Sequence, residues 1–421
     1  MNGCTAQRVD LVESHAHLLQ LGRSLSMADL SGCESAAHMI DVIAAHSRGL
    51  APDAWVLGHG ARPESWADPA WPSIEMLDRA VDGRALCAWC FDYHALVASS
   101  SALRRATIDA SSRFAKGRVD LDASGRPTGL LIEHAALALW ERVPEPDPEI
   151  RTELVRSACD HLRSLGFAEV HDMKAQPWLG RILRDLDDAG ELAVSVRLYA
   201  LLDDLEQLHA SRSSWQNDRV SLAGGKIFTD GTLNSRTAHM LSPYADAPPD
   251  HPSGMAMMSA DEIRSAVRTV DAMGLPLAAH AIGDGAVRAT LDAIESVRPR
   301  SGPFRIEHAE LIDREDVPRF AQLGVVASLQ PCHLLADIEA LRRAVPDRLD
   351  RVLPIRELID AGLKPGRDLV FGSDVPIVRA DPDDSVRAAV DRRREGMQAE
   401  QAVSFEQSID EPVAWACFAR V

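Results

Sequence analysis

Short apolar runs that each end in a potential metal ligand recur along this 421-residue chain, and they constrain its fold more than any other feature. Each run is strand-like in length and composition, and each opens into a loop. A parallel β-barrel gathers the C-terminal ends of its strands at one mouth, where a metal site can form. The pattern predicts such a barrel, with the site built by the ends of 11–17, 167–172, 224–230, 275–280, 304–308 and 369–374.

Amphipathic helical stretches alternate with these runs. Asp147 is the expected N-cap of a helix over 148–166, and Ser259 with Glu262 forms the expected capping box of another. Strands that alternate with helices predict a parallel sheet with right-handed crossovers. Further helices are predicted at 313–323, 355–363 and 384–394, and further strands at 85–93, 194–201 and 325–330.

Nine strands are predicted, one more than the eight of a (β/α)8 TIM barrel. This α/β barrel is nevertheless the fold class that we expect. The interval between 17 and 167 is too long for one crossover, so strand 85–93 is assigned to a large insertion after the first barrel strand. We expect 1–17 with 151–421 to form the barrel and 18–150 to form the insertion. Its own small core, over the barrel mouth, would be built on Trp55, Trp66, Trp71, Trp89 and Trp140.

Charge and composition exclude several classes of partner. The net charge of -18 argues against nucleic acid, whose phosphates require a basic surface. The chain shows no secretory signal and no apolar run long enough to span a membrane. Seven cysteines, an odd number, suit a reducing cytoplasm. We therefore expect a cytoplasmic protein with a small-molecule substrate; a homo-oligomer is possible, but the sequence carries no sign of one.

Four histidines at strand ends are candidate metal ligands. His15 and His17 are two apart on one strand, so both side chains point to the same face, although such a pair also occurs by chance. His280 and His308 end two later strands about one βα unit apart. A single such histidine is usually a hydrogen-bonded core residue, whereas the whole set favours a metal site.

Lys226 and Asp374 complete the candidate set. Lys226 shares strand parity with Asp230, and burial would lower its pKa so that the neutral amine could react with carbon dioxide to give a carbamate ligand. The alternative is a simple ion pair with Asp230 or Asp374. Asp374 follows the last strand, where a carboxylate can take a proton from water beside a metal and pass it to a leaving group.

The ordered set resembles the amidohydrolase superfamily of metal-dependent TIM-barrel hydrolases. The surrounding phrases are similar to its amidohydrolase-3 branch, which includes N-substituted formamide deformylases and YtcJ-like proteins. The resemblance runs from about residue 10 to about residue 415 and rests on 14–18, 170–173, 226–231, 235–238, 280–284, 305–309, 328–331 and 371–376.

The resemblance implies a site for one or two divalent ions, with zinc as the expected metal. His15 and His17 would bind one ion, His280 and His308 the other, and a carboxylated Lys226 would bridge them. Asp374 would act as ligand and general base, while a metal-activated hydroxide cleaves a non-peptide C–N bond of an amide, formamide or cyclic amide.

Three further residues are candidates for substrate contact. His94 lies in a phrase similar to the D-G-H segment of the branch, with Tyr93 in place of glycine. His171 and Arg236 follow strand ends, where barrel active sites are built. For these two the alternative is a structural hydrogen bond within a βα loop.

Two departures from the family pattern leave rival functions open. Glu13 stands where the branch usually has aspartate, and the flanking β-sandwich of family members is expected to be missing or vestigial. One rival is a mononuclear deaminase of the same superfamily, against which Lys226 weighs. The other is a non-catalytic ligand-binding barrel, against which the full set of ligands weighs.

Overall fold

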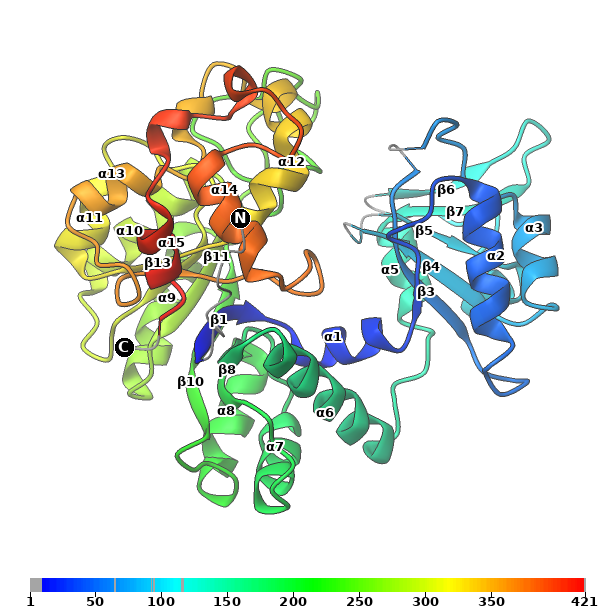
Figure 1. Cartoon of the computed structure of the whole chain (residues 1–421), viewed down its shortest axis with the longest axis horizontal. Coiled ribbons are helices and arrows are strands. Elements are labelled where there is room, and N and C mark those ends of the chain that lie inside the picture. The colour runs from blue at the N-terminus through cyan, green and yellow to red at the C-terminus, as the bar shows by residue number, and fades with distance from the viewer. Residues whose placement is uncertain (1–9, 64–65, 92, 94, 115–116, 420–421) are drawn as a thin grey trace, which may run out of the picture. The chain divides into compact units, whose positions relative to one another are not determined.

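Eight parallel strands form one sheet, and every candidate metal ligand lies on one of these strands or within three residues after it (Figure 1). The computed structural model describes residues 10–63, 66–91, 93, 95–114 and 117–419. The strands follow one another around the sheet in chain order, and each pairs in parallel with the next. The predicted (β/α)8 barrel is thereby confirmed, with strands β1 (Leu11–Ala16), β8 (Phe167–Asp172), β9 (Ser195–Leu201), β10 (Val220–Phe228), β11 (Leu277–Ala281), β12 (Arg305–His308), β13 (Val326–Leu329) and β14 (Leu369–Phe371).

Helices between the strands cover the outside of this sheet (Figure 1). The predicted capping box is present at the start of α9 (Ala260–Ala272), because Glu262 accepts from the Ser259 backbone and Ser259 Oγ accepts from the Glu262 backbone. The helices of this part are α6 (Pro148–Ser164), α7 (Leu179–Asp188), α8 (Leu202–Ser211), α9 (Ala260–Ala272), α10 (Asp284–Val297), α11 (Val317–Leu323), α12 (Pro331–Ala344), α13 (Ile355–Asp360), α14 (Pro382–Asp391) and α15 (Glu411–Ala416).

The start of α11 differs from the prediction of a helix over 313–323. The helix begins at Val317, because residues 313–316 form a turn in which the Asp316 backbone N–H donates to the Asp313 carbonyl at 3.0 Å. Pro318 then occupies the first turn, where its missing N–H costs no hydrogen bond.

Strands β1 and β14 meet at a seam that is closed in two ways. At the mouth, Asp374 N donates to the His15 carbonyl at 2.8 Å, and His17 N donates to the Val375 carbonyl at 3.0 Å. Deeper in the barrel, the segment 417–419 takes the place of direct strand pairing. Val12 N donates to the Phe418 carbonyl at 2.8 Å, and Phe371 N donates to the Cys417 carbonyl at 3.0 Å. The first and last strands are thus joined at the candidate ligands themselves.

Residues 19–154 form a second compact unit around a six-stranded mixed sheet of order β2-β3-β4-β5-β7-β6. Alternate residues of β4 pack into two separate cores: Leu86 and Ala88 in one, Cys87 and Trp89 in the other. The cores also contain side chains of the helices. The elements are α1 (Leu18–Leu25), β2 (Ala28–Asp29), α2 (Ala36–Ser47), β3 (Val56–Ala61), α3 (Ile74–Ala80), β4 (Leu86–Cys90), β5 (Ala95–Ala98), α4 (Ser100–Ala106), β6 (Gly117–Leu121), β7 (Pro127–Glu133) and α5 (His134–Trp140).

The predicted domain limits, 1–17 with 151–421 and 18–150, and the capping role stay predictions. The other compact unit comprises the chain before residue 19 and after residue 154.

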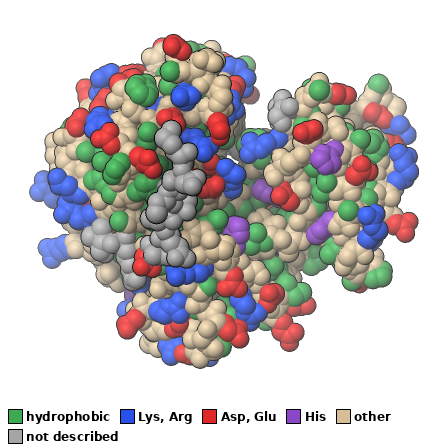
Figure 2. All heavy atoms as spheres, viewed as in Figure 1, with side chains coloured by type: hydrophobic (Ala, Val, Ile, Leu, Met, Phe, Trp, Pro, Cys, Tyr) green, Lys and Arg blue, Asp and Glu red, His purple; other side chains and the backbone are tan. Residues whose placement is uncertain are grey.

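Among the described residues, no helix combines the length and the apolar character needed to cross a bilayer. Acidic and basic side chains are interspersed over the face of the protein in Figure 2, so on that face the charge of -18 forms no single acidic patch.

Candidate metal centre

His15, His17 and Asp374 form the first half of the candidate centre, at the seam between β1 and β14. One ligand atom of each lies within 4.8 Å of the others. His17 Nε2 is 2.9 Å and His15 Nε2 is 3.5 Å from the same oxygen, Asp374 Oδ1. Two imidazoles and a carboxylate that converge in this way are a suitable ligand set for a divalent transition metal.

Lys226, His280 and His308 form the second half, on β10, β11 and the end of β12. The rings of His280 and His308 have centroids 4.6 Å apart, and the His308 centroid is 4.7 Å from that of His15. Lys226 Nζ lies 5.2 Å from the centroid of the Phe228 ring, which in turn is 5.0 Å from that of His280. The contact between His15 and His308 makes the two halves one continuous cluster.

Several buried polar atoms of the cluster have no hydrogen-bond partner among the described residues. They are Nδ1 of His17, His280 and His308, and Nζ of Lys226. A buried donor or acceptor without a partner is costly, and native proteins rarely leave one uncompensated. Four such nitrogen atoms in one cluster of imidazoles fit a centre in which metal ions would be their partners.

Lys226 Nζ has no hydrogen-bond partner among the described residues, although the charges of Glu307 and Asp374 favour its protonated form. Asp230 is instead engaged by the backbone: its carboxylate accepts from the N–H groups of His239, Ile282 and Gly283 at 2.9, 3.0 and 2.9 Å. The Asp230 side chain thereby organises the loops after β10 and β11.

Burial sets the protonation states of the cluster. It lowers the pKa of His15 to about 4, that of His280 to about 3 and that of Lys226 to about 8. Burial alone would raise the pKa of Asp374, but the neighbouring His15 and the hydrogen bond from His17 hold it well below its usual value. Neutral imidazoles and an ionised carboxylate are the states that metal ligands require.

Glu13 supports the first half from beneath. Its Oε1 accepts from the backbone N–H groups of His15 at 3.0 Å and Ser373 at 2.9 Å, and its Oε2 accepts from Ser373 Oγ at 2.9 Å. A Cβ on Gly372 would lie 2.7 Å from Glu13 Oε1 and 2.6 Å from His15 N. The carboxyl group of Glu13 therefore requires a glycine opposite it.

Beneath the mouth, Glu307 and Arg305 connect His15 to the barrel interior. His15 Nδ1 lies 2.7 Å from Glu307 Oε2, and Glu307 Oε1 accepts from Arg305 Nε at 2.7 Å. Sequence reasoning noted this strand only for His308. The signal was available, because Arg305 and Glu307 are charged residues that share one face of a buried strand.

His333, in the first turn of α12, was also missed. Its Nδ1 is 3.3 Å from Glu310 Oε1, its Nε2 is 3.2 Å from the Ser373 carbonyl, and its ring centroid is 6.0 Å from that of His308. Burial lowers the pKa of His333, but the Glu310 carboxylate outweighs burial and raises it to about 9. Its position four residues after the end of β13 was the available signal.

The three predicted substrate contacts have different surroundings. His171 Nδ1 lies 2.7 Å from Arg305 Nη1, and His171 Nε2 lies 3.3 Å from Glu169 Oε1. Arg236 donates to the Asp246 carboxylate at 2.7 and 2.6 Å. The Arg236 bonds lie within the loop between β10 and α9 and match its structural alternative, whereas the His171 contacts are to strand residues and not within a loop. Substrate contact stays a prediction for both. His94 lies outside the described residues.

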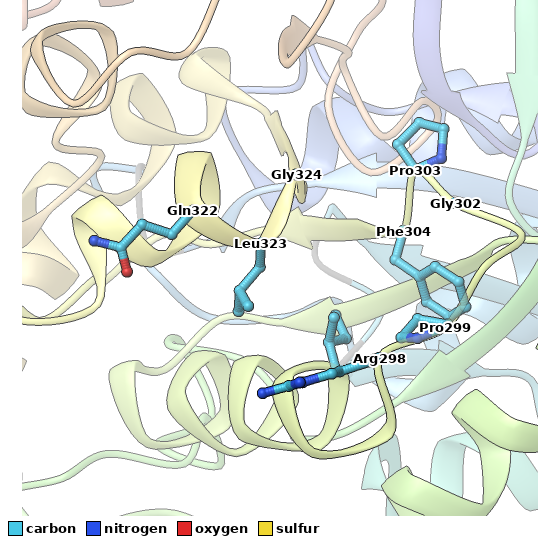
Figure 3. A pocket seen from close by; sticks show the side chains of 9 residues that line it. Arg298, Pro299, Gly302, Pro303, Phe304, Gln322, Leu323 and Gly324 are labelled. Atoms are coloured by element: carbon cyan, nitrogen blue, oxygen red, sulfur yellow. The ribbon is translucent and has the colours of Figure 1, made fainter.

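A hollow of about 300 Å³ lies at the N-terminal end of β12, opposite the end that carries His308 (Figure 3). Its lining comes from the end of α10, the start of β12 and the end of α11, and includes Arg298, Phe304 and Leu323. None of the candidate ligands lines it. Because the active sites of such barrels lie at the C-terminal mouth, this hollow is not assigned to the chemistry.

Known proteins are similar to this chain over most of its length. A model of the amidohydrolase family matches residues 11–411. The putative amidohydrolase YtcJ of Bacillus subtilis is 27% identical over 404 residues, covering 91% of this chain and 72% of that protein. The N-substituted formamide deformylase of Arthrobacter pascens is 24% identical over 421 residues, covering 94% and 76%. The structure of an uncharacterized metal-dependent hydrolase from Pyrococcus horikoshii OT3 superposes with a TM-score of 0.77 at 28% identity, covering 96% and 78%.

Proposed function

The chain belongs to the amidohydrolase family, and on that premise we propose that this metal-dependent hydrolase cleaves the C–N bond of a small amide, formamide or cyclic amide. Two of the similar proteins are named for an amidohydrolase and for a deformylase of N-substituted formamides. The single observation that carries the proposal is the convergence of His15, His17 and Asp374 beside buried nitrogen atoms that lack partners.

In this proposal, His15 and His17 hold one divalent ion, His280 and His308 hold a second, and Asp374 serves as a ligand. Imidazole and carboxylate groups suit zinc, which is the metal we propose. When bound, such an ion supplies a Lewis acid that polarises a carbonyl group and lowers the pKa of water.

We further propose that Lys226 carries a carbamate between the two ion positions. The neutral amine nitrogen would bond to the carbon of carbon dioxide and release one proton, which leaves an anionic group. With a pKa of about 8, roughly a tenth of the amine is neutral at pH 7. The lack of a hydrogen-bond partner for Nζ among the described residues supports this role.

Asp374 is the proposed general base. Its Oδ1 is the oxygen that both His15 and His17 approach, so proton transfer is assigned to Oδ2. This oxygen takes a proton from the attacking water and delivers it to the departing nitrogen, which must leave as a neutral amine.

Phe228 offers an apolar wall for the substrate. Its side chain is 36% exposed, although its ring lies against His280 and Lys226. An aromatic ring left open beside ligand residues favours contact with an apolar substituent of the substrate.

Elemental analysis of the protein, purified without chelator beside Lys226→Ala, tests the proposal. Close to two ions per chain, fewer in the variant, with hydrolysis in a panel of amides, is the expected result. One ion indifferent to Lys226, with turnover of aminopurines or aminopyrimidines instead, would replace the proposal with a mononuclear deaminase. No metal, with no hydrolysis across the panel, would make the chain a non-catalytic barrel.

A further inference from the structure

Arg305 and Glu307 are a buried ion pair directly beneath a proposed metal ligand. They lie two apart on β12, so their side chains share its inner face, and they are 5% and 0% exposed. Burying two charges is costly, and it is not by itself evidence of a stabilising role. The position of this pair therefore calls for another explanation.

The contacts of Glu307 determine where the proton of His15 resides. Arg305 remains a cation and donates to Glu307 Oε1 at 2.7 Å, so Glu307 is a carboxylate, which can only accept. Its other oxygen lies 2.7 Å from His15 Nδ1. The Nδ1 atom must therefore carry the hydrogen, and the lone pair of the neutral ring is on Nε2. That atom faces Asp374 Oδ1 at 3.5 Å, on the side of the proposed ion.

Arg305 is itself held by contacts to three other strands, of which only β13 is adjacent to β12. Its Nη2 donates to the Ser14 carbonyl on β1 and to Ser328 Oγ on β13, both at 2.9 Å. Its Nη1 is 2.7 Å from His171 Nδ1 on β8. Ser14 is the residue directly before His15. One guanidinium therefore fixes the backbone beside His15 and, through Glu307, the His15 ring.

We propose that Arg305 and Glu307 are positioning residues that hold His15 in the Nδ1–H tautomer with Nε2 directed at the metal. The inference rests on the proposed function, because it requires His15 to be a ligand. In the same network His171 accepts at Nδ1 from Arg305 and donates at Nε2 to Glu169. These bonds give His171 a structural role. A carboxylate that orients a ligand histidine typically affects metal affinity 10- to 100-fold.

The test is zinc affinity of the full chain, stripped of metal and titrated against a chromophoric chelator. In Glu307→Gln, zinc affinity should fall on the order of 10- to 100-fold. Glu307→Asp keeps the charge beside Arg305 but withdraws it from His15, so affinity should fall there too while the fold is kept. This second variant carries the test if Glu307→Gln fails to fold.

Asp316→Asn is the matched control. Asp316 is a buried carboxylate that also pairs with arginines, Arg288 and Arg319, but on the outside of the barrel. Its zinc affinity should remain within about twofold of the wild-type value. In a cobalt-loaded sample, the visible ligand-field bands should shift in Glu307→Asp and not in the control, because only the former alters a ligand.

Two results would overturn the inference, and they differ in what else they overturn. If wild-type protein binds zinc and folded Glu307→Asp binds it equally well with unchanged cobalt bands, the pair is only structural and the proposed function stands. If wild-type protein binds no zinc, the proposed function fails as well.

Discussion

The two halves of the candidate centre contrast in how their atoms are satisfied. In the half at the seam, His17 Nε2 contacts Asp374, and His15 Nδ1 contacts Glu307. In the other half, Nδ1 of His280, Nδ1 of His308 and Nζ of Lys226 have no partner among the described residues. In the first half only His17 Nδ1 lacks a partner among the described residues, and in the second half His280 Nε2 does have one, the Gly231 carbonyl at 3.0 Å. The first half is thus more completely hydrogen-bonded than the second.

Asp374→Asn breaks the first half at its shared carboxylate and should have the largest effect. Loss of a general base lowers kcat by about 10²- to 10⁴-fold. Metal should remain bound, because four histidines are left as ligands. Turnover of an amide substrate, measured beside elemental analysis, checks both statements.

The matched control is Asp347→Asn, which makes the same charge change at a side chain that is 76% exposed. Its kcat should equal that of the wild type. Full activity in Asp374→Asn would remove Asp374 from the mechanism.

Gly372→Ala should disrupt the first half through packing alone. The new Cβ would lie 2.6 Å from His15 N and 2.7 Å from Glu13 Oε1, so the backbone must shift. We expect the free energy of unfolding to fall by about 3 kcal/mol, with weaker metal binding. Denaturant unfolding measures the first effect and chelator competition the second.

Gly32→Ala is the comparison for that variant, since a Cβ there meets nothing within 4 Å. Its stability should match the wild type. If Gly372→Ala behaved identically, the close approach of Glu13 and Gly372 would have no energetic weight.

Lys226→Met tests the second half. It replaces a buried amine that lacks a hydrogen bond with an apolar chain of similar length, so the metal-free protein should gain about 2 kcal/mol in stability. The metal-loaded protein should lose an ion. Denaturant unfolding of chelator-treated samples measures the gain, and elemental analysis measures the loss.

The exposed Lys364 provides the control, because Lys364→Met removes the same charge at the surface. It should leave both quantities unchanged. A metal-free Lys226→Met protein less stable than wild type would mean that Lys226 already has a stabilising partner.

The pH dependence of the metal-free protein gives the smallest effect. The pKa of Lys226 is about 8 in the folded protein and about 10.4 when unfolded, so between these values the unfolded chain binds more protons. Stability therefore rises with pH, by about 1 kcal/mol from pH 7 to pH 9. Subtracting the Lys226→Met curve isolates this rise, and a flat difference would contradict the lowered pKa.

Much of the barrel could be predicted because each strand and helix carries its own local pattern. The positions of His280 and His308 at strand ends identified them as candidate ligands, and the capping box predicted where α9 begins. The contacts that support His15 could not be predicted, because Arg305 reaches Ser14 across 291 positions of the chain. Strand parity places Arg305 and Glu307 on one face of the strand, but it does not identify the histidine that they contact.

The Lys226 environment shows the same limit. Sequence parity placed Asp230 on the same face of the strand, which suggested an ion pair. In the folded chain the Asp230 carboxylate binds three backbone N–H groups, one from its own loop after β10 and two from the loop after β11. Only the tertiary arrangement of those loops determines that the Asp230 carboxylate is not hydrogen-bonded to the Lys226 amine.

The seam has a consequence for the order in which the molecule is made. A ribosome releases β1, with its two histidines, long before Asp374 and the segment 417–419 that complete its hydrogen bonds. Domains fold as units once their elements have emerged. Until residue 419 is available, the nascent barrel lacks the hydrogen bonds through which segment 417–419 joins β1 and β14. Completion of the seam is therefore coupled to synthesis of the chain through residue 419.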